Sequence, residues 1–231
     1  MKYKNVIEGV FLSRPNRFIA QVLVDGKEET VHVKNTGRCK ELLVDNARVY
    51  LSVSDNPARK TKYDLVAVEK VTDRGALLIN MDSQIPNDAV AEWLPVSGLF
   101  SESAVIRREY TFGKSRFDFF VQDADKKAFI EVKGVTLEND GIVSFPDAPT
   151  ERGVKHIEEL ISALEQGYES YIVFVVQMKG VVEFRPNRER HPQFADVLKK
   201  ADEAGVKIVA VDCLVAADEM KIDSEIKVNL L

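Results

Sequence analysis

The sequence is poor in the residues that build covalent frameworks and metal clusters. Its 231 residues include two cysteines, Cys39 and Cys213, which lie far apart, and only three histidines. A disulfide framework or a zinc cluster is therefore not expected. A glycine-rich nucleotide-cradling loop and a Ser-His-Asp arrangement are also missing, so nothing favours a kinase or an esterase.

Long apolar segments are missing as well. No run of about 18 uncharged apolar residues occurs, which excludes a membrane-spanning helix. Residues 1–5 lead into a strand-like segment and not into the apolar core of a signal peptide. We therefore expect a cytoplasmic protein without a membrane partner.

The charge is uneven along the chain. A net charge of -5 argues mildly against a nucleic-acid-binding protein. Residues 1–80, however, hold 14 Lys and Arg against 10 Asp and Glu, a net of +4, and the rest holds 18 against 27. This asymmetry indicates a basic binding module joined to an acidic body. Chance scatter of surface charge is the alternative, because a surplus of four is small.

The first eighty residues have the pattern of an all-β unit. Short β-branched segments alternate with turns rich in Gly, Pro, Asn and Asp, which is typical of a small barrel. An oligonucleotide-binding-type barrel fits the length. The expected strands are residues 6–13, 18–24, 30–33, 48–53, 65–71 and 76–80.

A change of pattern follows this unit. Residues 87–94 have helical spacing of apolar side chains, and Pro95 and Gly98 then end the helix. We place the junction here, so residues 1–82 are expected to form the barrel and residues 83–231 an α/β domain.

The second part alternates strands and helices. This order predicts a partly parallel sheet with flanking helices and right-handed crossovers. The expected strands are residues 104–112, 116–122, 127–135, 171–177 and 206–211, and the expected helices are residues 151–166 and 194–204.

Two apolar strands of the second part are interrupted by charged residues. Asp118 lies in one of them, and Glu131 and Lys133 lie on one face of the next, because strand residues two apart point the same way. Ionised groups inside apolar strands are costly unless they are paired or bind metal. If the strands form a hairpin, Asp118 and Glu131 converge on a hard cation such as Mg²⁺ or Mn²⁺. Lys133 would then orient water or stabilise charge on a phosphate, and an inter-strand ion pair is the alternative.

The spacing alone does not identify this site. Asp212 is followed by Glu225 and Lys227 at the same distances as Asp118 is by Glu131 and Lys133. The second copy lies in a polar segment at the end of the chain, where solvation explains the charges. Strand context therefore favours the first copy.

Several longer segments are more specific. The second part contains residues 116–118 (RFD), 131–137 (EVKGVTL) and 145–156 (FPDAPTERGVKH), and the first part contains residues 32–43 (HVKNTGRCKELL) and 60–65 (KTKYDL). These segments and their order along the chain closely resemble the sugar fermentation stimulation protein family (SfsA). The resemblance covers nearly the whole chain. It implies an oligonucleotide-binding-like barrel followed by a PD-(D/E)xK nuclease-like domain of mixed α/β type. Phe117 stands where that motif has proline, which affects no metal ligand.

The resemblance also implies a function. It predicts sequence-nonspecific binding of DNA, with RNA as a second possible partner, and Mg²⁺-dependent phosphodiester hydrolysis at Asp118, Glu131 and Lys133. The alternative is a non-catalytic DNA-binding regulator of maltose or sugar metabolism that keeps the nuclease fold. Glu109 is a candidate third carboxylate, although a surface glutamate beside two arginines would have the same pattern.

Cationic residues complete the expected nucleic-acid interface. Arg152, Lys155 and His156 share one face of a helix whose N-terminus favours phosphate, with a solvated helix face as the alternative. Arg116 joins them on the strand that carries Asp118. In the barrel, a basic groove is expected from a set of cations with Tyr63 as aromatic platform: Lys34, Arg38, Lys40, Arg59, Lys60 and Lys62.

Overall fold

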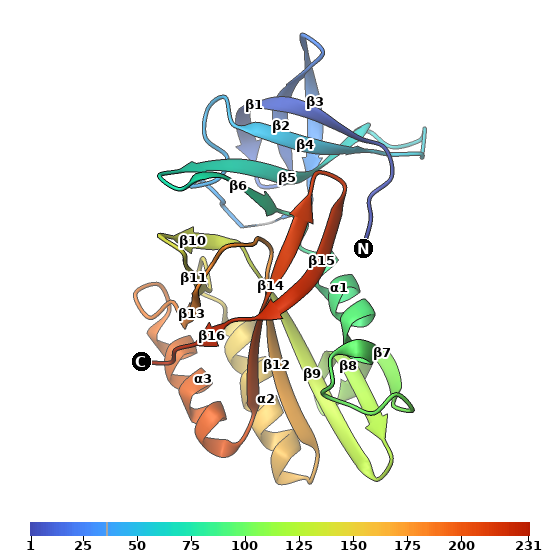
Figure 1. The fold of residues 1–231 in the computed structure, drawn as a ribbon, viewed down its shortest axis with the longest axis vertical. Coiled ribbons are helices and arrows are strands. Elements are labelled where there is room, and N and C mark those ends of the chain that lie inside the picture. The colour runs from blue at the N-terminus through green and yellow to red at the C-terminus, as the bar shows by residue number, and fades with distance from the viewer. Residues whose placement is uncertain (36) are drawn as a thin grey trace.

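The first part of the chain forms a closed barrel in a computed structural model that describes residues 1–35 and 37–231 (Figure 1). Thr36, in the middle of the 32–43 segment, lies outside the described residues. The sheet order is β3-β2-β1-β4-β5-β6, and a parallel pairing of β3 with β5 closes the barrel. Its strands are β1 (Val6–Asn16), β2 (Ile19–Val24), β3 (Lys27–Val33), β4 (Arg48–Val53), β5 (Tyr63–Thr72) and β6 (Gly75–Asn80).

Alternation and turn chemistry explain the first hairpins. Ala20, Val22 and Val24 of β2 point into the barrel and are buried, while the residues between them are more exposed. Asp25 and Gly26 have positive φ angles of 48° and 77°. Such a pair makes a tight turn whose twist matches the flanking strands. The turn expected between the strands at residues 18–24 and 30–33 is therefore confirmed.

The second part is a mixed sheet with helices, as predicted. The strand order is β15-β14-β12-β9-β8-β7, in which β9, β12 and β14 run parallel and the other neighbours antiparallel. Within the described residues, no helix is long and apolar enough to cross a membrane. The elements of this part are α1 (Ile85–Trp93), η1 (Leu94–Val96), β7 (Val105–Phe112), β8 (Ser115–Asp123), β9 (Lys126–Val135), α2 (Glu151–Glu165), β12 (Glu169–Val176), α3 (Pro192–Ala204), β14 (Lys207–Ala216) and β15 (Glu219–Glu225).

A small second sheet was not predicted. Its strands are only two to four residues long, too short to show a period of two. The edge strand β15 was also missed, because its polar sequence suggested a solvated segment. The small sheet consists of β10 (Leu137–Asn139), β11 (Ile142–Phe145), β13 (Glu183–Pro186) and β16 (Lys227–Val228).

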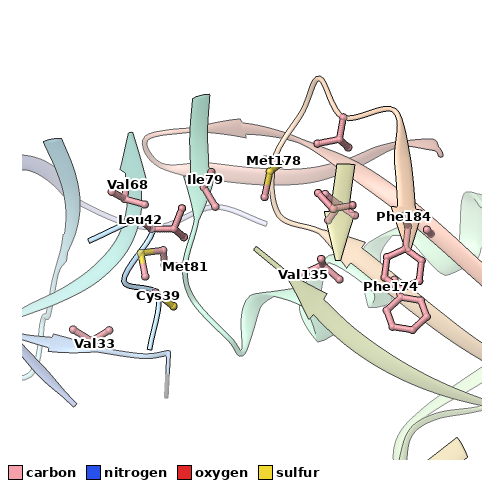
Figure 2. Packing of buried hydrophobic residues seen from close by; sticks show 14 of the residues in the cluster. Val33, Cys39, Leu42, Val68, Ile79, Met81, Val135, Phe174, Met178 and Phe184 are labelled. Atoms are coloured by element: carbon pink, nitrogen blue, oxygen red, sulfur yellow. The ribbon is translucent and has the colours of Figure 1, made fainter. Parts of the chain in front are cut away.

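One hydrophobic core connects the two parts. Ile79 and Met81 leave the barrel and belong to the same buried cluster as Val135, Phe174 and Met178 of the mixed sheet (Figure 2). Burial of continuous apolar surface resists separation of the parts, at about 25 cal/mol for each Å² removed from water. The barrel is therefore packed firmly against the sheet.

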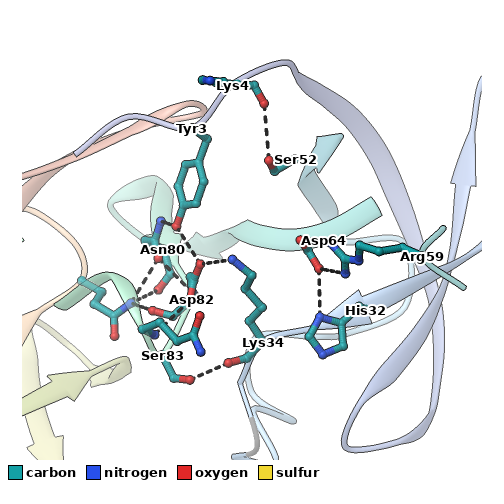
Figure 3. Close-up of polar contacts among 12 residues, drawn as sticks. Tyr3, Lys4, His32, Lys34, Ser52, Arg59, Asp64, Asn80, Asp82 and Ser83 are labelled. Carbon is teal, nitrogen blue, oxygen red and sulfur yellow. Dashed lines mark hydrogen bonds and ion pairs between the residues drawn. The ribbon is translucent and has the colours of Figure 1, made fainter. Parts of the chain in front are cut away.

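Polar contacts hold the same junction. Gln177, at the end of β12, donates from Nε2 to the carbonyl oxygens of Asn80 and Asp82, both at 3.1 Å. The Asp82 carboxylate pairs with Lys34 of the barrel at 3.0 Å (Figure 3). Because these groups are mostly buried, each lost bond would leave an unsatisfied group, which fixes the orientation of the barrel.

Residues 1–3 lie outside the barrel. The Tyr3 amide donates to the carbonyl oxygen of Asp218 at 2.7 Å, and Lys2 bridges to Glu219. The Tyr3 hydroxyl accepts a hydrogen bond from Asn80 at 2.9 Å. This segment therefore joins the end of the barrel to the edge of the mixed sheet.

Candidate metal centre and nucleic-acid interface

Asp118 and Glu131 lie where a hairpin ladder ends. Strands β8 and β9 pair from Asp123 and Lys126 to Phe119 and Ile130, and no further pair follows. Instead, the Asp118 carboxylate accepts from the amide of Val132 at 2.8 Å. The side chain thus takes the place of a missing ladder bond and is held at the opening between the strands. The predicted hairpin is confirmed, and it brings the two acids together.

Helix α1 contributes a contact that the sequence did not reveal. Asn87 donates from Nδ2 to Oδ1 of Asp118 at 2.7 Å. Burial raises the pKa of Asp118 most, and the negative charge of Glu131 raises it further. The two carboxylates therefore repel each other, which is the electrostatic setting that a cation relieves. The sequence placed Asn87 in a helix, but nothing in its spacing indicated the strand that it touches.

Glu131 is almost completely enclosed, with 2% of its surface exposed. Its Oε1 accepts from Lys133 Nζ at 2.5 Å and is hydrogen-bonded to His156 Nδ1. Burial opposes ionisation, but the hydrogen bond from His156 and the charge of Lys133 outweigh it and lower the pKa of Glu131. Its Oε2 is buried and has no hydrogen-bond partner among the described residues. A buried ionised oxygen without a partner is costly, and a bound cation would remove that cost.

The donor set fits a hard divalent ion. Asp118 and Glu131 offer carboxylate oxygens, and Mg²⁺ commonly takes one or two carboxylates and keeps several waters. Over residues 1–35 and 37–231, no group of three or more His, Cys, Asp and Glu side chains lies close enough to hold a metal. The arrangement thus suits an ion that shares its coordination with water and substrate, and it does not suit a closed structural site.

His156 connects the acids to the surface of α2. Thr150 caps this helix, because its Oγ1 accepts from the Gly153 amide at 3.0 Å. Arg152 Nε donates to Nε2 of His156 at 3.3 Å, so the other ring nitrogen carries the proton that it donates to Glu131. The sequence suggested a histidine that binds phosphate or handles a proton. The structure places its Nδ1 against Glu131, where it orients the carboxylate.

The second Asp and Glu-x-Lys copy is dispersed. Asp212 pairs with Lys179 at 2.9 Å, and Lys227 pairs with Glu183 at 2.8 Å. Glu225, at the end of β15, is exposed. These three residues do not converge, which agrees with the preference for the first copy.

Glu109 is not brought into the centre. Its backbone lies opposite Asp118 in the β7–β8 register, between the pairs formed by Arg108 and Tyr110. The side chain is 65% exposed and lies 3.6 Å from Arg116. Its φ of 55° is unusual for a strand residue other than glycine. Glu109 is thus a surface partner of Arg116.

A basic pocket lies next to the acids. It brings together four residues expected from the sequence to bind nucleic acid, Arg116, Arg152, Lys155 and His156. Lys114, in the β7–β8 turn, also lines it. Sequence reasoning missed Lys114, although its place in a turn shortly before Asp118 was a usable signal.

A second basic patch lies on the barrel. Arg38 and Lys40 line a pocket with Arg14 and Arg17. Arg14 donates to four carbonyl oxygens of the neighbouring loops and so shapes the pocket. The guanidinium of Arg17 lies 5.0 Å from the ring centre of Phe18, which is 49% exposed. An exposed ring beside cations is a stacking platform for bases. We call Arg17, Phe18, Arg38 and Lys40 the barrel patch.

Tyr63 does not form the expected aromatic platform. Tyr63 is only 5% exposed, because it begins β5 and packs into the barrel core. Two of the expected cations are also engaged internally: Lys34 with Asp82 at 3.0 Å, and Arg59 with Asp64 at 2.6 Å (Figure 3). Lys62 stays exposed, with its ammonium 4.9 Å from the ring of Tyr63.

Two of the distinctive sequence segments meet between the barrel and the sheet. A side chain at Gly37 would come within 2.6 Å of Asp147 Oδ2, so the barrel loop and the loop after β11 are in close contact. Both residues line a polar cavity with Gly134 and Gln177, next to Lys133. Strand β9, which carries Glu131 and Lys133, therefore reaches the junction of the two parts at Gly134.

Comparisons with known proteins agree with this architecture. A family model described as "Sugar fermentation stimulation protein RE domain" matches residues 84–219, and one described as "SfsA N-terminal OB domain" matches residues 12–78. The predicted oligonucleotide-binding-type barrel and mixed α/β part are thereby confirmed.

Relatives match over the full length. A "Sugar fermentation stimulation protein homolog" of Clostridium beijerinckii is 56% identical over 100% of both chains. A homolog of the same description from Desulfitobacterium hafniense is 54% identical and covers 100% of this chain and 99% of its own. "The structure of Pyrococcus Furiosus SfsA in complex with Ca2+" is similar with a TM-score of 0.87 at 29% identity, over 99% of this chain and 98% of that one.

Proposed function

This chain belongs to the sugar fermentation stimulation protein family, and we propose that it binds DNA without sequence preference and hydrolyses its phosphodiester bonds with a divalent metal ion. One observation carries the proposal. Oε2 of Glu131 is buried without a hydrogen-bond partner among the described residues, and burial and the charge of Glu131 raise the pKa of the Asp118 carboxylate. A bound cation relieves both costs. The related Pyrococcus furiosus protein is described with Ca²⁺, which takes the same kind of oxygen ligands.

The residues around the acids have distinct tasks in this proposal. Asp118 and Glu131 would hold Mg²⁺ or Mn²⁺, which supplies Lewis-acid stabilisation of a phosphate and lowers the pKa of water. Asn87 and His156 keep the two carboxylates oriented through their hydrogen bonds. Lys133 supplies a positive charge where negative charge develops on the scissile phosphate. These tasks are those of phosphodiester hydrolysis.

The surface charges support nucleic acid as the substrate. The pocket lined by Arg116, Arg152 and Lys155 flanks the acids, and the barrel patch adds further cations and an exposed ring. Contacts of this kind bind the phosphate backbone and stack on any base, so they carry little sequence information. This agrees with binding that does not depend on sequence.

Cleavage assays test the proposal. Single- and double-stranded DNA and RNA are incubated with Mg²⁺ or Mn²⁺, and with EDTA as the blank. We expect metal-dependent cleavage that is lost in Asp118→Ala and Lys133→Ala. Glu225→Ala is the matched control, because Glu225 belongs to the dispersed copy and is exposed. Loss of cleavage in Glu225→Ala, or cleavage that survives Asp118→Ala, would contradict the assignment.

A non-catalytic DNA-binding regulator is the second candidate. It is favoured by the hydrogen bond between Lys133 and Glu131, since a lysine engaged in this way neutralises the buried acid without any catalytic role. Salt-sensitive DNA binding without cleavage under any metal would identify this function.

A further inference from the structure

We infer that the basic pocket beside the metal centre is a phosphate subsite, which holds a phosphate group of the nucleic-acid strand other than the scissile one. The inference deepens the proposed function and rests on nucleic acid being the ligand. The pocket lies between the β7–β8 turn and the start of α2, with Lys114 and Arg116 on one side and Arg152 and Lys155 on the other.

The charge in this pocket is suited to an anion. Its four cations face one carboxylate in the lining, Glu151, whose side chain is 83% exposed. Outside the lining, Lys155 and Arg116 have carboxylate partners only at 3.7 Å (Glu159) and 3.6 Å (Glu109), beyond direct hydrogen-bond distance. Four cations cannot neutralise one another, so an incoming phosphate removes repulsion as well as gaining charge-assisted hydrogen bonds.

Ser115 is the independent observation that points to a ligand. This residue lines the pocket and is 6% exposed. Its hydroxyl is buried and has no hydrogen-bond partner in the described part of the chain. A buried hydroxyl left unsatisfied is costly. A phosphate oxygen is the acceptor that this hydroxyl lacks.

The helix α2 favours the same ligand. Its first residues, Glu151 and Arg152, line the pocket, and a helix N-terminus has partial positive charge. Arg152 also contacts His156, which contacts Glu131. Arg152 therefore lies two hydrogen bonds away from the Glu131 carboxylate, and a phosphate held by Arg152 would lie one contact further. The subsite would set the position of the strand relative to the acids.

Binding of labelled oligonucleotides in EDTA tests the subsite without cleavage. The probes share one sequence and have a 5′-phosphate, a 3′-phosphate or no terminal phosphate. We expect Ser115→Ala to weaken binding about tenfold, in the range of one lost hydrogen bond to a charged group. Its unfolding midpoint should be unchanged or higher, because its hydroxyl makes no bond in the free protein. Lys155→Ala should weaken binding and lower the salt slope by about one.

The probes also identify the source of the phosphate. If the subsite takes a strand end, one phosphorylated probe binds more tightly and the variants abolish that difference. If it takes an internal phosphate, all probes bind alike and the variants weaken them equally. Lys200→Ala, an exposed lysine on α3, is the matched control and should bind like the parent protein.

The inference is overturned if Ser115→Ala and Lys155→Ala bind every probe as tightly as Lys200→Ala does. This failure is distinct from failure of the proposed function. Variant-sensitive binding in EDTA without hydrolysis under Mg²⁺ or Mn²⁺ would remove the nuclease assignment and leave the subsite. Metal-dependent hydrolysis together with unchanged binding by the variants would support the nuclease assignment and remove the subsite.

Discussion

His156 Nδ1 is hydrogen-bonded to Oε1 of Glu131, so a helix residue orients a carboxylate that lies 25 positions earlier on a strand. This contact and the one from Lys133 both engage the same oxygen. The other oxygen, Oε2, is thereby left for a cation. His156 and Lys133 thus determine which oxygen of Glu131 stays without a hydrogen-bond partner among the described residues.

Replacing His156 by Ala should lower Mn²⁺ affinity by about 10- to 100-fold, the usual effect of removing a partner of a metal ligand. Isothermal titration with Mn²⁺ measures it. His156→Gln should recover part of the loss, because its amide can donate to Glu131. Unchanged Mn²⁺ affinity in a folded His156→Ala protein would show that Glu131 needs no such support.

Lys133→Ala should slow cleavage about 100- to 1000-fold, as the loss of one charge-stabilising donor does in other enzymes. Nucleic-acid binding should change little, since the barrel patch and the basic pocket remain. Lys227→Ala is the matched control, because Lys227 has the same Glu-x-Lys spacing but pairs with Glu183. Equal loss in the two variants would refute a special role for Lys133.

Gly134→Ala should destabilise the protein by about 1–3 kcal/mol, the range of overpacking a filled site. A Cβ atom there would lie 2.5 Å from Gln177 Oε1 and 2.9 Å from Pro86 Cγ. Urea unfolding measures the loss. In a double-mutant cycle, Gln177→Ala should relieve part of the clash. The free energy of unfolding should then fall by less in the double variant than the sum of the two single losses. Strict additivity would argue against the clash.

The Arg59–Asp64 pair should give stability that disappears in acid. Burial would raise the pKa of Asp64, but the hydrogen bonds from Arg59 and His32 outweigh it and lower that pKa below 3.8. A lowered folded-state pKa means that the contribution is present above the unfolded value and is lost as the pH falls through the folded one. The stability difference between the parent protein and Arg59→Ala should therefore shrink below about pH 4. Unfolding in urea at a series of pH values tests this, and a constant difference would contradict it.

Phe18→Ala should weaken single-stranded DNA binding by about 1–3 kcal/mol, the value of one stacked base. Stability should change little, because the ring is 49% exposed. Fluorescence anisotropy measures the affinity. The control is Val71→Ala, an apolar residue that is 87% exposed on the β5–β6 hairpin. If both variants bind equally well, bases do not stack on the barrel patch.

The sequence predicted those features that a local pattern encodes. Strand β4 was predicted with its observed bounds, since a short segment of mainly apolar residues, among them Val49 and Val53, lies between turns. The convergence of Asp118 and Glu131 followed from strand period and hairpin order. The small sheet was missed because strands such as β10, Leu137–Asn139, are too short for any period.

Contacts between distant elements were not predictable in the same way. Asn87 and Asp118 meet because α1 packs beside β9, and no spacing records that approach. His156 was expected on its helix face as a phosphate-binding or proton-handling residue, and its contact with Glu131, which follows from the packing of α2, was not foreseen. Tyr63 was expected to be exposed, and the closure of the barrel buried it. In each case tertiary packing determined the environment of the side chain.

The contact of Tyr3 with Asp218 joins two segments that lie far apart along the chain. Such a long-range contact closes slowly, because the chain between the two segments must be ordered first. As the ribosome proceeds, the barrel strands can pair early, but residues 1–3 must wait for β15 to emerge. The docking of residues 1–3 thus follows the synthesis of β15, and a chain that lacks β15 would keep this segment undocked.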